Sequence, residues 1–527
     1  MSFADPYQGK KWSILDASAF TENKTLEADI IIIGSGSGGG VCAEELSAKG
    51  YRVILVEEGP LKTSSDFKML ESEAYPELYQ ESAARLTKDK GIKILQGRNV
   101  GGGTTINWTT SFRTPPETLS HWRDKYQLEN FTEEKLRRYF EKAERRVNIE
   151  KWQVEANQNN LKLKMGMEKL GLTAGVISRN VKDCYNLGYC GMGCPTNAKQ
   201  SMLVTTIPAA LENGATLIHH LNAFRLNFSG QKIAGLECRA RDRRGNGYTG
   251  ITLKLQAKHY ILSGGAIGTP ALLLRSNAPD PYDLLGKRTF LHPVSLSGAL
   301  FKDPIEAYAG APQVIYSDHF IYHPSQNMQE SPGFKLEVPP IHPVILAGTA
   351  PFHGLKNREL MLNLNHFQTI ISLIRDGFDE RSVGGQVYLK GDGFAALDYP
   401  ISDYLWRGIE KSYLAMAEIQ FAAGAEKVFP LHNDAEFYQS WAQAKTAIPS
   451  LSKKILKAKL VSAHVMGGCP MHNSPSKGVL DQNSRHHHIE NLSIIDGSCF
   501  PTSVGANPMQ SILALAYRQV EILASAL

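Results

Sequence analysis

A short apolar run that ends in a glycine-rich turn limits the possible folds of this chain more than any other feature. Residues 29–34 are Asp-Ile-Ile-Ile-Ile-Gly, a continuous β-branched segment typical of a parallel strand that is buried on both faces. A helix is predicted over residues 41–49, with Gly50 as its stop, and a second buried strand over residues 52–56. Together they form one βαβ unit of about thirty residues.

The turn inside this unit fits the pattern G-x-G-x-x-G. Its three glycines allow the tight turn, the approach of a pyrophosphate to the backbone, and the packing of the helix on the strand. Glu57 follows the last of them by 18 residues, and its carboxylate can accept hydrogen bonds from ribose hydroxyls. The predicted contacts are Gly34, Gly36, Ser37, Gly38, Gly39, Glu57 and Glu58. NAD and FAD both fit this unit.

A second glycine-rich run, residues 97–107, favours FAD over NAD. It reads Gly-Arg-Asn-Val-Gly-Gly-Gly-Thr-Thr-Ile-Asn, and such a run makes a second cradle of backbone amides suited to a diphosphate and a flavin ring. An ordinary surface loop is the alternative interpretation. The residues expected to contact the cofactor here are Arg98, Gly102, Gly103, Thr104 and Asn107.

The same run resembles the signature of the glucose–methanol–choline (GMC) oxidoreductase family, G-R-x-x-G-G-[SG]-[ST]-x-x-N. Residues 263–274 match the second signature of that family, and residues 285–293 resemble its Asp-His-Pro turn. The resemblance implies an α/β fold with an α+β second domain: a Rossmann-like FAD-binding domain and a discontinuous antiparallel-sheet substrate-binding domain. The length of 527 residues also requires more than one core. The FAD-binding domain is expected over 25–115, 215–298 and 460–527, and the substrate-binding or cap domain over 116–214 and 299–459.

The resemblance also implies further contacts with FAD. They fall on Phe224, Gly265, Asp496, Gly497, Pro508 and Met509. Relatives that bind FAD covalently have histidine immediately before the signature asparagine, where this chain has Ile106. We therefore expect non-covalent FAD.

By the same resemblance, the catalytic pair is His464 and Asn507. Hydride can leave an alcohol carbon only if the hydroxyl proton is removed as the carbonyl forms, and a neutral imidazole is a suitable base. Asn507 can hold the substrate oxygen through its amide. The other histidines are expected to be structural or solvated, including His486, His487 and His488, which lie in a polar stretch rather than a metal site.

Three cysteines, Cys184, Cys190 and Cys194, fall within eleven residues and end in Cys-Pro. This spacing resembles that of family members with an iron–sulfur cluster. The residues that follow instead resemble the long-chain fatty alcohol oxidase subgroup, in which the thiols are expected to be buried, free or paired. We favour that subgroup and expect no metal, with the cluster as the alternative.

Two segments bear on an apolar substrate. The apolar residues of 360–374 could line a tunnel by helical spacing, although such a stripe is more often plain core. Lys453, Lys454, Lys457 and Lys459 could bind a membrane surface, but a solvated helix face is favoured. Elsewhere, residues 116–215 are expected to be mostly helical and residues 216–262 to form strands.

Composition and charge bear on which classes of partner the protein can bind. A surplus of five positive charges over 527 residues gives no field that implies nucleic acid. The first twenty residues do not resemble a secretory signal, and no run reaches the ~20 apolar residues of a spanning helix. We expect a cytoplasmic protein, with peripheral membrane contact as an option. Its partners are expected to be a small alcohol and O2.

The leading hypothesis is therefore FAD-dependent oxidation of a long-chain primary alcohol, with electrons passing to O2. A dehydrogenase that reduces a quinone or cytochrome, and an oxidase of sterol or terpenoid alcohols, are alternatives within the same chemistry. A flavin-binding protein without turnover and a light-dependent fatty-acid lyase are alternatives of other classes.

Overall fold

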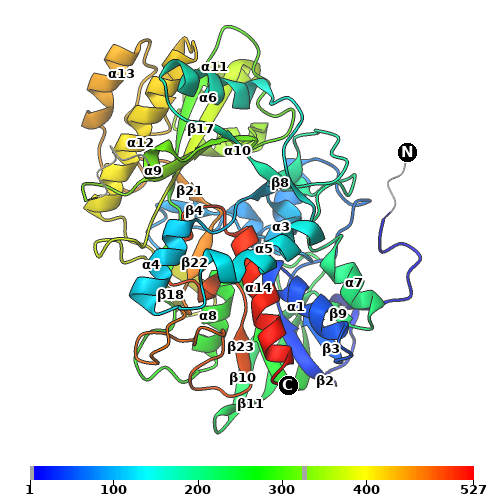
Figure 1. Ribbon diagram of the computed structural model, residues 1–527. Coiled ribbons are helices and arrows are strands. Elements are labelled where there is room, and N and C mark those ends of the chain that lie inside the picture. The colour runs from blue at the N-terminus through cyan, green and yellow to red at the C-terminus, as the bar shows by residue number, and fades with distance from the viewer. Residues whose placement is uncertain (1–4, 323–328) are drawn as a thin grey trace.

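The computed structural model describes residues 5–322 and 329–527 of the chain. Two eight-stranded sheets organise it, one in the lower and one in the upper part of Figure 1. The strand order of the first sheet is β1-β9-β3-β2-β12-β11-β10, and β23 pairs with β12. The strands span Ser13–Asp16 (β1), Lys24–Ile33 (β2), Val53–Val56 (β3), Thr216–His219 (β9), Leu221–Ser229 (β10), Lys232–Arg241 (β11), Tyr248–Leu262 (β12) and Leu492–Ile494 (β23).

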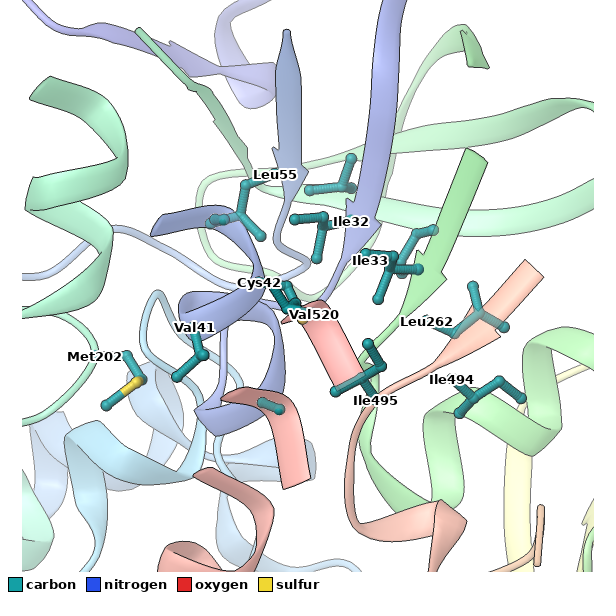
Figure 2. Packing of buried hydrophobic residues seen from close by; sticks show 14 of the residues in the cluster. Ile32, Ile33, Val41, Cys42, Leu55, Met202, Leu262, Ile494, Ile495 and Val520 are labelled. Atoms are coloured by element: carbon teal, nitrogen blue, oxygen red, sulfur yellow. The ribbon is translucent and has the colours of Figure 1, made fainter. Parts of the chain in front are cut away.

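The predicted βαβ unit lies at the centre of this sheet. Strand β2 pairs in parallel with β3 on one side and β12 on the other, which explains why its apolar run is buried on both faces. Helix α1 (Ser37–Ser47) follows the glycine turn, and its Val41 and Cys42 are buried, with Val41 facing Met202 (Figure 2). Both strands and the helix are confirmed, although α1 begins earlier than predicted because the three glycines at 38–40 already belong to it.

Helices cover this half of the molecule. Helix α14 contacts both α1 and α5, and the side chain of Thr132 caps α5 by accepting from the Lys135 N–H, as its sequence predicts. The helices of this half span Glu71–Leu78 (α2), Gly103–Ile106 (α3), Pro116–Tyr126 (α4), Glu133–Arg146 (α5), Thr206–Glu212 (α7), Gly265–Arg275 (α8) and Met509–Ala524 (α14). The strands expected over 216–262 are confirmed as β9 to β12.

The second large sheet has the order β4-β21-β14-β17-β16-β15-β7, and β20 pairs with β14. Most neighbours in it are antiparallel. Helices α6 (Gln158–Lys169) and α12 (Asp403–Ala422) pack against it. Its strands span Ile92–Ile94 (β4), Gly175–Val176 (β7), Val294–Leu300 (β14), Ile315–Ser317 (β15), Phe334–Glu337 (β16), Phe367–Ile374 (β17), Lys427–Pro430 (β20) and Leu460–Ser462 (β21).

The helical spacing considered for residues 360–374 is wrong, whereas the favoured interpretation as plain core is confirmed for Leu360 and residues 367–374. Helix α11 (Gly354–Leu362) ends at the third residue of the 360–374 segment. Residues 367–374 form strand β17, which lies between β14 and β16. All eight residues of β17 are buried. A central strand covered on both faces needs a continuous apolar run, and periodicity alone cannot separate such a run from a buried helix.

The helix expected to carry the lysines at 453–459 is also absent, because residues 451–459 are irregular between α13 (Trp441–Ala447) and β21. Lys453 pairs with Glu410 and Lys457 with Asp434, both at 2.7 Å. Within the described residues, no helix is both long and apolar enough to cross a lipid bilayer.

Two small sheets complete the fold, with the orders β19-β18-β13-β22 and β5-β8-β6. Their strands span Thr110–Ser111 (β5), Ile149–Lys151 (β6), Ser178–Asn180 (β8), Lys287–Leu291 (β13), Gly385–Leu389 (β18), Ala395–Asp398 (β19) and Val465–Gly467 (β22). Two short helices, His319–Tyr322 (α9) and Pro343–Thr349 (α10), lie between β15 and β17.

Candidate active site

Two imidazoles meet where β13 and β22 pair. His292 follows β13, His464 precedes β22, and Leu291 pairs with Val465 in the antiparallel register. This register places the two histidines side by side, with their Nδ1 atoms 3.0 Å apart and their rings nearly perpendicular. The two chain segments are 172 residues apart in sequence, so the pair exists only in the folded chain.

A backbone amide favours one tautomer of His292. The Gly505 N–H donates to Nε2 of His292 at 3.2 Å, so the hydrogen of a neutral His292 lies on Nδ1 and points at His464. These two hydrogen bonds connect His464 to the loop that carries Asn507. Nε2 of His464 has no partner among the described residues and is the ring nitrogen left to meet a substrate.

Asn507 lies just before α14 and faces a buried carboxylate. Its Nδ2 donates to Oε2 of Glu337 at 3.2 Å, and Nε2 of Gln313 donates to the same oxygen at 2.6 Å. Oδ1 of Asn507 and Oε1 of Glu337 are both buried without a hydrogen-bond partner. Buried polar atoms without partners are rare, and here two of them belong to side chains that contact each other.

Burial shifts the pKa values of these groups in opposite directions. It lowers the pKa of His464 to about 4 and holds that of His292 well below its ordinary value, where nearby His464, Arg375 and Lys335 lower it further. It raises the pKa of Glu337 to about 7, although Lys335 acts against this rise. Both histidines are therefore neutral at neutral pH, and Glu337 titrates near it.

The two glycine-rich segments face each other at the start of α1 and α3. A Cβ added to Gly102 would lie 2.9 Å from Cα of Gly36, whereas a Cβ on Gly36 or Gly103 would meet nothing within 4 Å. Backbone amides thus border open space on both sides of this contact, as a diphosphate cradle requires. Glu57 is buried beside it and accepts from the Ser35 and Gly59 N–H groups. These residues fit FAD.

Segments from the end of the chain join this cradle. A Cβ on Gly38 would lie 1.8 Å from the Ile495 carbonyl oxygen, so the turn and the end of β23 are in contact. Asp496 accepts from the Gly265 N–H at 2.8 Å and so ties the start of α8 to the Gly497 turn. Nδ2 of Asn107 contacts Sδ of Met509 at 3.0 Å, which brings the signature segment to Pro508 and α14.

The remaining predicted contacts already have protein partners. Arg98 donates to the Gly245 carbonyl at 2.7 Å, and Glu58 pairs with Arg241 at 2.6 Å. The ring of Phe224 lies 3.2 Å from the Arg239 guanidinium. Ser37 begins α1, and Thr104 donates to the Gly101 carbonyl within the α3 turn.

The cysteine segment forms no site for a single metal ion among the described residues. Cys184, Cys190 and Cys194 are free, and among the described residues their Sγ atoms do not form a group within 4.8 Å of one another. Between them and the signature segment lies the buried Lys199, whose Nζ donates to the carbonyls of Thr105, Asn107 and Cys190. Lys199 was missed by sequence reasoning because nothing in a Lys-Gln-Ser triplet signals burial.

Family comparisons agree with this geometry. The N-terminal domain model described as GMC oxidoreductase matches residues 75–294, and the C-terminal domain model matches residues 381–516. The chain belongs to the GMC oxidoreductase family. As predicted, this GMC oxidoreductase is an FAD-dependent enzyme that acts on CH–OH groups.

Several relatives cover nearly the whole chain. The GMC-type oxidoreductase y4nJ of Sinorhizobium fredii is 30% identical, covering 94% of both chains, and the long-chain-alcohol oxidase FAO4A of Arabidopsis thaliana is 27% identical over 93% of this chain. This chain spans 68% of FAO4A and 66% of FAO4B, about two thirds of these plant relatives. Pyridoxine 4-oxidase of Mesorbium loti shares the fold, with a TM-score of 0.69 at 16% identity, covering 94% of this chain and 99% of that one. The predicted fold class is confirmed.

Proposed function

We propose that this GMC oxidoreductase oxidises a long-chain primary alcohol to its aldehyde at His464 and Asn507. The observation that carries the proposal is the hydrogen-bonded chain from Gly505 through His292 to His464, which unites the two predicted catalytic segments. The similarity to the long-chain-alcohol oxidases FAO4A and FAO4B of Arabidopsis thaliana supports the substrate class. The contacts proposed for FAD are the glycine-rich cradle and the residues at its rim described above.

FAD, when bound, supplies the acceptor for the hydride that leaves the carbinol carbon. His464 takes the hydroxyl proton at Nε2, the nitrogen without a protein partner. For this, His464 must carry its own hydrogen on Nδ1 and donate it to Nδ1 of His292, which requires His292 to adopt the tautomer opposite to the one that the Gly505 N–H favours. Asn507 uses its second Nδ2 hydrogen to hold the substrate oxygen, because the first is engaged by Glu337.

Glu337 is the second candidate for the base. The Gly505 N–H favours the opposite His292 tautomer, in which His464 would donate rather than accept. Oε1 of Glu337 is buried without a partner, and a carboxyl group with a pKa of about 7 is well matched to proton transfer at neutral pH. We retain His464 as the first choice because its free nitrogen is a neutral base over the whole physiological range.

We propose O2 as the electron acceptor. The rival is a dehydrogenase that passes electrons through a cluster at Cys184, Cys190 and Cys194, and the visible spectrum and the peroxide assay distinguish the two. FAD is proposed to be non-covalent because Ile106 offers no nucleophile next to Asn107. Acid precipitation should accordingly leave all of the flavin in the supernatant, and flavin retained in the pellet would contradict this.

The test of function is an anaerobic absorbance spectrum before and after addition of dodecanol, followed by air and a peroxide assay. The proposal predicts that the flavin bands bleach with the alcohol and return in air with formation of peroxide. Bands that never bleach would contradict the substrate, and bleaching without peroxide on reoxidation would contradict the acceptor. A sterol alcohol tested in parallel, if it bleached the flavin faster, would replace the aliphatic substrate.

A further inference from the structure

Three potential metal ligands meet at the edge of the first sheet. Strands β1 and β9 pair in parallel, with Asp16 opposite His219 at their carboxyl ends. His220 follows directly, and its N–H donates to the Gly59 carbonyl. The cluster lies beside β3, near the N-terminal segment in Figure 1, and shares no residue with the proposed catalytic pair.

The backbone at His220 is what brings the two imidazoles together. Successive side chains of a strand point to opposite faces, but His220 has a φ of 54°, the left-handed region that is uncommon for residues other than glycine. This conformation turns its ring to the side of His219, and the two ring centroids lie 4.9 Å apart. Non-glycine residues in this region often belong to functional sites.

The facing atoms are all electron-pair donors. Nδ1 of His220 lies 3.0 Å from Nδ1 of His219 and 2.9 Å from Oδ1 of Asp16, and the third separation is 3.9 Å. The single Nδ1 of His220 carries at most one hydrogen. One hydrogen on this nitrogen cannot serve both contacts well, so hydrogen bonds among the three groups leave one of the two contacts poorly satisfied.

The surroundings suit a cation. Both histidines are buried, whereas the Asp16 side chain is 29% exposed and leaves a path for entry. A neutral imidazole offers a lone pair at one ring nitrogen, and the Asp16 carboxylate offers an anionic oxygen.

We propose that Asp16, His219 and His220 bind a divalent transition-metal ion, with Zn²⁺ as the best match. Zn²⁺ takes imidazole nitrogen and carboxylate oxygen at about 2.0–2.2 Å in tetrahedral geometry, which requires ligand separations of roughly 3.4 Å. The observed separations of 2.9–3.9 Å bracket that value. Mg²⁺ and Ca²⁺ prefer oxygen ligands and should bind poorly. The ion would link the edge strand β1 to its neighbour β9.

The expected affinity is moderate. Ligating histidines usually donate their other ring nitrogen to a partner, and loss of that partner costs about 10–100-fold in affinity. Nε2 of His220 is buried without a partner. The site should therefore bind Zn²⁺ more weakly than a site with full outer support, and EDTA should strip it readily.

The test is titration of the EDTA-treated, FAD-loaded enzyme with ZnCl2 by calorimetry, with thermal unfolding measured in parallel. The wild type should bind one Zn²⁺ per chain, in competition with EDTA but not with excess MgCl2, and its unfolding midpoint should rise with Zn²⁺. His219→Ala and Asp16→Asn should lose this binding. His488→Ala removes a histidine from another part of the chain and should retain it.

The flavin spectrum of each variant shows whether it is folded, and Asp16→Asn preserves the shape of the side chain if His219→Ala does not fold. Binding that is absent from the wild type would overturn the proposal. So would a stoichiometry that is the same in the wild type, Asp16→Asn and His488→Ala, because the Zn²⁺ would then sit elsewhere.

Discussion

The two sides of the candidate active site are built from different chemistry. On one side His464 faces a second imidazole, and its pKa is lowered to about 4 by burial. On the other, Asn507 faces Glu337, whose pKa is raised to about 7. Loss of water on burial causes both shifts. The imidazole is therefore unprotonated, and available as a base, at neutral pH, whereas the carboxyl group becomes a base only above about pH 7. Each of the two proton acceptors therefore predicts its own pH profile.

The largest expected effect is on the histidine side. In His464→Ala the rate constant for anaerobic flavin reduction by dodecanol should fall by about 10³-fold, within the range for loss of a general base. Stopped-flow absorbance measures it, with the flavin content of the variant as the check on folding. A decrease of less than tenfold would indicate that Glu337, and not His464, is the base.

A smaller loss is expected on the amide side. Asn507→Ala removes one hydrogen bond to the substrate oxygen and should slow flavin reduction by about 10²-fold, as for the loss of one positioned donor. Asn507→Asp is no substitute for this variant, because its carboxylate would face the carboxyl group of Glu337 in place of the donating amide. Equal slowing for dodecanol and for a shorter alcohol would confirm action at the reacting oxygen. Slowing confined to one chain length would contradict it.

Glu337→Gln should change pH dependence more than rate. Its folded pKa of about 7 exceeds the ordinary 4.5, so the stabilisation it provides is complete below pH 4.5 and is lost as the pH rises through 7. The difference, on the order of 3 kcal/mol, should be missing in the variant. Chemical unfolding at pH 4.5 and pH 8 measures it. An identical pH dependence in both proteins would show that the carboxyl is not buried as described.

The smallest effect is expected for the cysteines. Cys190→Ser should leave the visible spectrum and the reoxidation rate unchanged, since the proposed oxidase passes its electrons to O2 and needs no cluster. Loss of a broad absorbance band in this variant would instead establish the dehydrogenase alternative.

Sequence reasoning was strongest where backbone geometry demands particular residues. The turn at Gly34 and the strand that leads into it were predictable. Only glycine readily adopts the positive φ of the turn, and a strand buried on both faces needs a continuous apolar run. The stripe at 360–374 was not, since a buried strand and a buried helix can share the same apolar run. His464 and Asn507 were found by motif.

The residues behind that pair were less visible. Glu337 lies between the two segments that the family models match, and a lone carboxylate there belongs to no motif. His292 was visible only as part of a turn, and its role depends on the pairing of Leu291 with Val465. Such contacts join segments far apart in the chain, which local patterns do not record.

The most direct test of the central claim is the pH dependence of anaerobic flavin reduction by dodecanol in the wild type and in Glu337→Gln. If His464 is the base, the rate constant should be level from about pH 5 upward and fall only toward pH 4, where the imidazole becomes protonated, and Glu337→Gln should keep this profile. A fall centred near pH 7 that disappears in Glu337→Gln would contradict the account and assign the proton to the carboxylate.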